Sequence, residues 1–309
     1  MAAFLHLSSS TVHLHLPSPQ RNKHPNSRSP IFSSTQHLIS CHDKSKLISS
    51  SPIYCNSSKN ESDHLHSFLE GFFALELDIP WEDDNLWSTM ALYLFSIHVP
   101  LSFGGLSVVA QVLHRHDLEP ETKAISILVI QTVELFTTIL LLRLTAKPHY
   151  KLTRFFKAKN FTNERNWLFG AILGFVFLIS VVFLTSYLAD LIAGTKAANS
   201  PALKEILVGG NASRTACVLV YCIVTPLLEE IMYRGFLLTS LVSKVKWRGA
   251  VLISSAIFST AHLSGENFVQ LFAVGVVLGC CYCWTGDLRS SVVLHSVYNG
   301  FILFVTYLS

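Results

Sequence analysis

Long apolar runs separated by short polar segments fill the chain from about residue 86 to its end. A helix needs about 20 apolar residues to cross the hydrocarbon core of a bilayer, and somewhat fewer when it is buried in a bundle. The pattern therefore predicts seven transmembrane helices, at about 87–113, 124–142, 167–189, 214–241, 249–264, 267–285 and 289–308. The expected fold class is an all-α, polytopic membrane protein.

Two of these apolar runs have unusual features. The first contains Pro100, Gly104 and Gly105, so we expect it to be kinked or broken into two pieces there. The fifth is short, and four of its residues are small and carry a hydroxyl group: Ser254, Ser255, Ser259 and Thr260. Small residues permit close contact between helices, so we expect the fifth helix inside the bundle rather than against lipid.

The N-terminal segment has a different composition. Residues 1–55 are rich in Ser, His and Pro and contain several basic residues but one acid, Asp43. A hydroxyl-rich, acid-poor segment without a continuous apolar stretch is typical of an organellar transit peptide rather than a secretory signal. The high serine content favours a chloroplast transit peptide that is cleaved near Cys55. A disordered cytosolic tail and mitochondrial import remain the alternatives.

The segment 56–85 is interpreted as an acidic connector. Its stretch 61–84 contains eight Asp and Glu residues and no Lys or Arg. A solvated linker is the favoured interpretation, and an interfacial or partner-binding helix is the alternative. The expected domains are thus this connector, the N-terminal transmembrane helices of 86–213, and a C-terminal core of 214–308.

Charges in the loops indicate an orientation. Basic residues dominate the loop between the second and third helices and recur after the fourth: Arg143, Lys147, Lys151, Arg154, Lys157, Lys159, Arg165, Lys244, Lys246 and Arg248. Both loops fall on one side of the membrane in a seven-helix count, as the positive-inside bias requires. In a plastid that side would be the stroma, with the N-terminus there and the C-terminus on the other side.

Overall composition supports a membrane protein and excludes other classes. Half of the residues are hydrophobic, 14% are charged, and the mean hydropathy is +0.43. The formal net charge of +3 comes without a basic aromatic patch, which argues against nucleic-acid binding. Five of the seven cysteines lie in apolar segments, where cysteine usually packs as a small residue. Cys280, Cys281 and Cys283 lack a second ligand pair at zinc spacing, so we expect packing there too.

Carboxylates within the fourth apolar run require a reason, since an ionised group in hydrocarbon is costly and usually functional. Glu230 and Arg234 are one helical turn apart and are expected to pair. Adjacent residues are separated by about 100° around a helix, so Glu229 and Glu230 are expected to face different neighbours. Glu229 is then the carboxylate left to act as a base.

Two histidines complete the pattern. Eight of the 14 histidines precede residue 67, and after residue 150 only His262 and His295 occur, both within apolar runs. His262 lies one turn after Phe258, and His295 one turn before Asn299. A carboxylate and one imidazole can activate a water, while the other imidazole and a carboxamide can stabilise an oxyanion, as amide hydrolysis requires.

These three motifs, Glu-Glu-x-x-x-Arg (229–234), Phe-x-x-x-His (258–262) and His-x-x-x-Asn (295–299), lie in this order within about the last 80 residues. Together they resemble the CAAX-protease and bacteriocin-processing family (CPBP, or Abi), which includes the type II CAAX prenyl endopeptidases. The resemblance covers about 214–308, a four-helix core. It implies that Glu229 and His262 activate the water and that His295 and Asn299 form the oxyanion site. It also implies that Glu230 and Arg234 support them, whereas Phe258 is expected to pack beside the site.

A metal cofactor is not favoured. One Glu and two His residues could be read as a zinc set, but their spacing does not match a known zinc protease, and the resemblance favours a glutamate-type mechanism. Three other polar residues in or near the apolar runs, Gln131, Glu134 and Asp190, match no motif and are expected to pack or to face loops. Among these, Glu134 is the candidate for a substrate cavity.

The leading functional hypothesis is an intramembrane endopeptidase of the thylakoid or inner envelope membrane that cuts a membrane-embedded or membrane-proximal peptide bond in a protein or peptide substrate. The alternative is a non-proteolytic scaffold or chaperone that regulates partner proteins in a plastid membrane. A transporter that uses Glu229 as a proton site is less favoured, because the sequence shows no internal repeat.

Overall fold

Regular secondary structure is entirely helical among the residues that the computed structural model describes. Those residues are 73–75, 81, 85–147, 151–156, 165–193, 201–265 and 267–308. The predicted transit peptide, its processing site near Cys55, and most of the acidic segment 61–84 lie outside them. The described residues all belong to one unit of the chain.

The helices of the N-terminal half begin with one continuous rod. It consists of α3 (Leu86–Leu92), the π-helix η3 (Tyr93–Gly104) and α4 (Gly105–Val112). The chain continues through α5 (Pro120–Thr145), the short 3₁₀ helix η4 (Leu152–Phe156), α6 (Trp167–Ala193) and α7 (Pro201–Val208).

A second continuous rod begins the C-terminal half. It comprises α8 (Asn211–Leu219), the π-helix η6 (Val220–Val224), α9 (Thr225–Glu229), the π-helix η7 (Glu230–Leu238) and α10 (Thr239–Val242). Three further helices follow, α11 (Trp247–Ala261), α12 (Phe268–Thr285) and α13 (Leu288–Leu308).

Six of the seven expected spans are long and apolar enough to cross a membrane in the described part of the chain. The all-α, polytopic fold class is thereby confirmed. The exception is α11, which has 15 residues. The helix α7 was not anticipated from the sequence.

The first helix was expected to be kinked or broken into two pieces; the break is wrong, and the kink stays a prediction. Residues Leu86–Val112 form one uninterrupted span of 27 residues, with Pro100 inside the π-helix η3. Proline lacks an N–H and clashes with the preceding turn of an α-helix, and a π-helical segment is a common way to absorb that defect. Gly105 lies against α5, where an added Cβ would come within 2.8 Å of Ile130. This glycine therefore allows close packing and does not end the helix.

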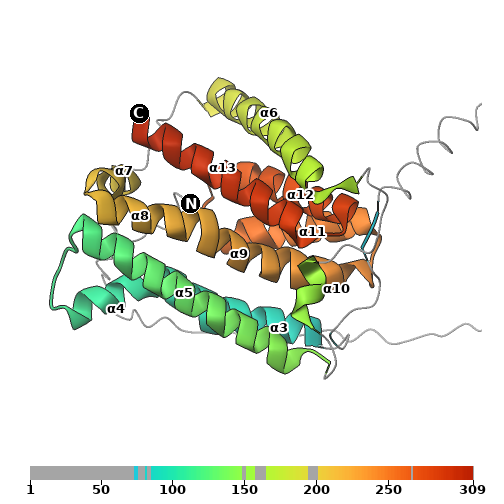
Figure 1. Cartoon of the computed structure of the whole chain (residues 1–309), viewed down its shortest axis with the longest axis horizontal. Helices are drawn as coiled ribbons and strands as arrows, with labels where there is room; N and C mark the ends of the chain where they lie inside the picture. The colour runs from blue at the N-terminus through green and yellow to red at the C-terminus, as the bar shows by residue number, and fades with distance from the viewer. Residues whose placement is uncertain are drawn as a thin grey trace, which may run out of the picture. The chain divides into compact units, whose positions relative to one another are not determined.

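The rod α8–α10 occupies the middle of the bundle. Figure 1 shows η3 and α5 on one side of this rod and α11, α12 and α13 on the other, with α6 against α12 and α13. In the apolar 18-residue stretch of this rod, 56% of the residues are buried. The corresponding stretches of the three preceding spans are 17–28% buried. The helix that carries Glu229 is thus the one most enclosed by protein among those four.

The helix ends that lead into the two basic loops lie at the same end of the bundle, as the loop charges predicted. Figure 1 shows α5 and α10 ending on the same side. Trp81 anchors this end, because its ring stacks on Phe155 of η4 at 5.8 Å and meets Phe236 of η7 edge-on at 4.6 Å. Which compartment this end faces remains a prediction.

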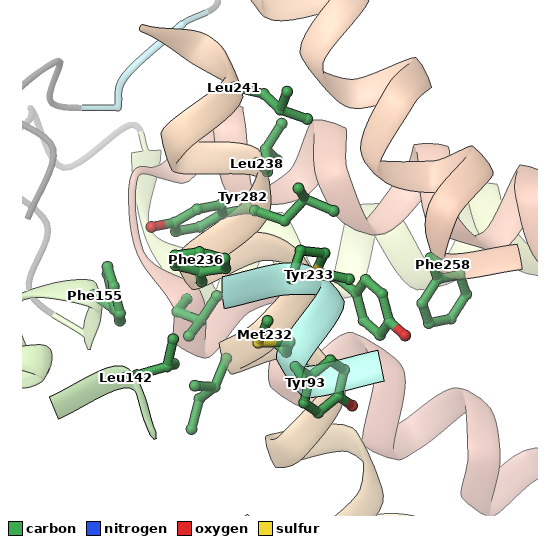
Figure 2. Close-up of a cluster of buried hydrophobic side chains, with 14 of the residues drawn as sticks. Tyr93, Leu142, Phe155, Met232, Tyr233, Phe236, Leu238, Leu241, Phe258 and Tyr282 are labelled. Atoms are coloured by element: carbon green, nitrogen blue, oxygen red, sulfur yellow. The ribbon is translucent and has the colours of Figure 1, made fainter. Parts of the chain in front are cut away.

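The largest hydrophobic cluster surrounds η7. All nine residues Glu230–Leu238 are buried. Figure 2 shows Met232, Tyr233 and Phe236 of this segment packed among side chains of other helices, such as Leu142 of α5 and Phe258 of α11. Because every side of η7 contacts protein, its charged residues are held away from lipid.

The expected placement of α11 inside the bundle is only partly correct. Its serines Ser254, Ser255 and Ser259 are buried, but Leu252 is 50% exposed on another face. The small residues face α12, where a Cβ on Gly275 would lie 2.9 Å from the Cβ of Ser255. The helix therefore uses its hydroxyl face for close packing and presents apolar side chains outward.

Candidate active site

The fold brings together the polar residues that the three motifs identified. Glu229 ends α9, while Glu230 and Arg234 lie in η7. His262 caps the end of α11, and His295 and Asn299 lie on α13. All of these side chains, and Phe258, are buried, with exposed fractions of 0–7%.

Glu229 faces both histidines. Its Oε1 lies 3.6 Å from Nε2 of His262, and its Oε2 lies 3.7 Å from Nε2 of His295. Both distances exceed the usual hydrogen-bond range of about 2.7–3.2 Å. One carboxylate therefore stands opposite two imidazole nitrogens, with a short gap on each side.

The end of α11 fixes the orientation of the His262 ring. The backbone N–H of His262 bonds to Ser259 O at 3.3 Å, so the carbonyl of Phe258 lacks its usual partner and instead accepts a hydrogen bond from Nδ1 of His262 at 2.7 Å. Leu263 then turns the chain with a φ of 49°. A carbonyl only accepts, so Nδ1 carries the proton, and in the neutral ring Nε2 presents a lone pair to Glu229.

His295 connects the two carboxylates. Its Nδ1 lies 2.9 Å from Glu230 Oε1, while its Nε2 faces Glu229. The expectation that Glu229 and Glu230 face different neighbours is therefore wrong for this ring. An imidazole ring has a nitrogen on each of two sides, so the one side chain of His295 reaches both Glu229 and Glu230 although they point in different directions.

Arg234 holds Glu230 in place. Its Nη1 donates to Glu230 Oε1 at 2.9 Å, which confirms the expected pairing. Its Nη2 donates to the carbonyl of Gly275 at 3.3 Å, and its guanidinium carbon lies 4.5 Å from the centre of the Phe258 ring. The Phe258 ring is also 4.6 Å from that of His262, so Phe258 packs beside the site as expected.

Asn299 is bound to the central rod. Its Nδ2 donates to the carbonyl of Tyr221 at 2.9 Å. In the π-helix η6 the N–H of Thr225 bonds to Val220 O, five residues back, so the next donor in the series would be residue 226. That residue is Pro226, which has no N–H, and Asn299 supplies the missing donor. One amide proton of Asn299 is thus committed to the fold, and the second remains for other partners.

Sequence reasoning missed a second polar cluster in the N-terminal helices. Glu134 was expected to pack or to face a loop and was the candidate for a substrate cavity. It packs, fully buried, where it accepts hydrogen bonds from Ser102 and Gln131 and contacts His98. The signal was present, because His98 and Ser102 are one turn apart within an apolar run, as are Gln131 and Glu134. The side chain of Asp190 lies outside the described residues.

The described residues contain no group of three or more His, Cys, Asp and Glu side chains that is arranged to hold a metal ion. The five cysteines of the apolar segments are free thiols: Cys217, Cys222, Cys280, Cys281 and Cys283.

The fold and site define a class: a multi-pass helical membrane protein that encloses a carboxylate, two imidazoles and a carboxamide. Residues 211–301 match the family model described as Type II CAAX prenyl endopeptidase Rce1-like. This match to the core supports the assignment to the CAAX-protease and bacteriocin-processing family that the motifs predicted.

Two bacterial membrane proteins are similar to the chain. The membrane-embedded CAAX protease MroQ of Staphylococcus aureus is 26% identical over 175 residues, which are 54% of this chain and 68% of MroQ. YdiL of Bacillus subtilis, whose name describes a membrane peptidase, is 30% identical over 86 residues, 28% of this chain and 35% of YdiL. No solved structure matches significantly. The chain is accordingly a CAAX-protease-like membrane peptidase.

Proposed function

We propose that the protein is an intramembrane endopeptidase that hydrolyses a membrane-embedded or membrane-proximal peptide bond with a water activated by Glu229 and His262. The observation that carries this proposal is the geometry around Glu229, whose two oxygens lie 3.6 and 3.7 Å from imidazole nitrogens on two other helices. The carboxylate thus faces both nitrogens without a direct hydrogen bond to either, as catalytic groups often do before substrate binds.

The protonation of His262 suits water activation. With its Nδ1 proton committed to the Phe258 carbonyl, the neutral ring offers Nε2 as an acceptor next to the Glu229 carboxylate. A water that binds to both groups donates one hydrogen to each, which directs its oxygen lone pair toward the carbonyl carbon of the substrate. Glu229 takes a proton as the C–O bond forms and returns it to the amine nitrogen as the C–N bond breaks.

The arrangement restricts how His295 can stabilise the oxyanion. Its Nδ1 proton is directed to Glu230, so Nε2 donates a hydrogen bond only when the ring is an imidazolium. Buried charges then balance, since two carboxylates, Glu229 and Glu230, are matched by Arg234 and His295. The second amide proton of Asn299 would be the other oxyanion donor.

We propose that this reaction needs no metal cofactor. The spacing of Glu229, His262 and His295 along the chain supports this, since it matches no known zinc protease, and Glu229 with His262 can activate the water without a cation. Cleavage in detergent should accordingly survive dialysis against a strong chelator and should not rise when zinc is added back. Loss of activity on chelation, with recovery on adding zinc, would contradict this part of the proposal.

The membrane and the substrate belong to the proposal as well. The composition of residues 1–55 supports a plastid membrane, either thylakoid or inner envelope, and substrates that are proteins of that membrane. The term CAAX in the names of the related proteins applies to those proteins. A member of the family in a plastid membrane would act on other protein substrates. Fusing residues 1–55 to a fluorescent protein tests the location, because import into plastids with loss of the segment is expected.

The function is tested with Glu229→Gln and His262→Ala in cells that lack the gene. Each variant is expressed at the abundance of the wild type, and membrane proteins and their new N-termini are quantified. Exposed residues of the same types provide matched controls, Glu119→Gln and His116→Ala.

We expect the same uncut membrane proteins to accumulate with both site variants and with neither control. Purified wild type should then cut those proteins in proteoliposomes. If both site variants restore the wild-type proteome, hydrolysis is not the function, and the scaffold hypothesis replaces it.

A further inference from the structure

A cleft of about 440 Å³ lies between the first two membrane spans, and none of its lining residues belongs to the candidate active site. Asn85 and the first two turns of α3 form one wall, and residues 144–147 at the end of α5 form the other. Figure 1 shows α3 beside this end of α5. Small-molecule sites in proteins have volumes of about 300–1,000 Å³, so the cleft is large enough to hold a ligand.

The α3 wall of the cleft changes from polar to apolar along the helix. Asn85, Ser88, Thr89 and Leu92 have the i, i+3, i+4, i+7 spacing that places residues on one helix face. The three polar residues come first, at the beginning of the span Leu86–Val112. Leu92 follows about one turn deeper and is 47% exposed. This wall thus offers hydrogen-bonding groups near the membrane surface and an apolar side chain below them.

The α5 wall has the same order. Thr145 and Lys147 lie at the end of the second span, and Leu144 just before them is 76% exposed. Trp87, the neighbour of Ser88, is 55% exposed, and tryptophan is typical of the boundary between lipid and water. The cleft therefore crosses that boundary, as a bound lipid does.

Thr89 is the residue that points to a ligand. It is 4% exposed, and its hydroxyl makes no hydrogen bond within the part of the chain that the structure describes. A threonine in an apolar helix can instead bond to its own helix, as Thr137 does to the carbonyl of Val133 at 2.8 Å. A buried hydroxyl without a partner is costly unless another molecule supplies the bond. Because Thr89 lines the cleft, a molecule bound there can supply it.

Neutral groups dominate the polar lining. The side chain of Asn85 makes no capping hydrogen bond to α3. Its amide can both donate and accept, and the hydroxyls of Ser88 and Thr89 can do the same. The hydroxyl groups of a sugar have this dual character too, so they can pair with such a lining in either direction. The lining therefore suits an uncharged sugar.

Charged headgroups fit this lining less well. Lys147 would attract an anion, but Glu82, Asp83 and Asp84 directly precede Asn85 in the sequence and would repel it. A choline headgroup is typically held by aromatic rings, and the lining that the structure describes contains none.

We propose that this cleft is a binding site for a glycolipid with an uncharged sugar headgroup. Asn85, Ser88 and Thr89 bind the sugar, and Leu92 and Leu144 contact the acyl chains. A free sugar would use only the polar part of both walls, whereas a glycolipid matches the polar and the apolar part together. The inference stands apart from the proposed function, because binding is measured without cleavage.

The test uses the purified full chain in vesicles of phosphatidylcholine, either alone or mixed with digalactosyldiacylglycerol or with anionic phosphatidylglycerol. Bound lipid is counted by native mass spectrometry across a lipid titration, and the temperature of unfolding is measured in each vesicle. Thr89→Val and Ser88→Ala each remove one hydroxyl of the cleft. Thr137→Val and Ser180→Ala are the matched controls, because the hydroxyls of Thr137 and Ser180 bond to carbonyls of their own helices.

A neutral hydrogen bond changes an affinity by a factor of roughly 3 to 10. We therefore expect Thr89→Val and Ser88→Ala each to weaken galactolipid binding by about this factor, and the two controls to leave it unchanged. In phosphatidylcholine alone, Thr89→Val should be at least as stable as the wild type, because a methyl group replaces a hydroxyl that has no partner. The galactolipid should raise the unfolding temperature of the wild type more than that of Thr89→Val, because it binds the folded state.

Several results would overturn the inference. Equal affinities of the wild type and both cleft variants, or equal losses in the controls, indicate lipid that coats the surface without a site. Stronger binding of phosphatidylglycerol indicates an anion site, and stabilisation by water-soluble galactosylglycerol to the same degree indicates a site for a free sugar. A Thr89→Val protein that is less stable in phosphatidylcholine alone, or does not fold there, indicates that this hydroxyl is structural.

Discussion

Replacing Arg234 with methionine should destabilise the protein far more than any exposed arginine substitution. The guanidinium is fully buried and makes three interactions: a charged hydrogen bond to Glu230, a longer bond to the Gly275 carbonyl, and a cation–π contact with Phe258. Methionine fills a similar volume but makes none of these. Glu230 would keep His295 as a partner but would lose its guanidinium.

The magnitude follows from those contacts. A hydrogen bond to a charged group contributes about 1.5–3 kcal/mol, and a desolvated cation–π contact about 2 kcal/mol. Removing one partner of a buried pair typically costs about 3–5 kcal/mol, because the other charge is left uncompensated. We therefore expect Arg234→Met to lower the free energy of unfolding by about 4 kcal/mol. The double variant Glu230→Gln/Arg234→Met should lose less, because no uncompensated carboxylate remains at position 230.

The assay is reversible unfolding in mixed micelles, followed by circular dichroism, for the two single variants and the double variant. Arg143→Met is the control, because Arg143 is also on a transmembrane helix but is exposed at its end. A surface arginine contributes about 0–1 kcal/mol. If Arg234→Met destabilises no more than Arg143→Met, or if the double variant is the least stable, the assignment of a buried, compensated pair is refuted.

Two further substitutions test the packing behind the site. Gly275→Ala would place a Cβ 2.9 Å from Ser255, so α11 and α12 must separate; we expect a loss of about 1–3 kcal/mol in the same unfolding assay, and none for Gly104→Ala, where nothing lies within 4 Å. Pro226→Ala restores a backbone N–H that competes with Asn299 for the Tyr221 carbonyl, so we expect kcat to fall about tenfold with unchanged stability. Wild-type kcat in Pro226→Ala would show that the position of Asn299 does not depend on the missing donor.

Much of the helical architecture could be read from the chain, because hydropathy is a local property. An uninterrupted apolar run has few stable forms in a bilayer other than a helix, since each backbone polar group must be satisfied within it. The polar motifs were visible for the same reason, because carboxylates and imidazoles stand out against an apolar background. The break at Pro100 was wrong because the sequence does not reveal whether a π-helical turn will absorb a proline.

Atomic partnerships were decided by tertiary structure. His295 touches Glu230 across 65 positions of sequence, and Asn299 binds the carbonyl of Tyr221 across 78. The pairing of Glu230 with Arg234 was predictable because both lie on one helix. The bridge of His295 between two adjacent glutamates depends instead on how α13 is rotated against the central rod.

The cluster around Glu134 shows the same division. The sequence by itself determined that Glu134 and His98 lie within apolar helices, and therefore that each needs a partner. Only the packing of η3 against α5 decided that these two are partners. Local hydrophobicity selects helices and their length, whereas the side-chain contacts between helices depend on rotation and register, which arise when the whole bundle packs.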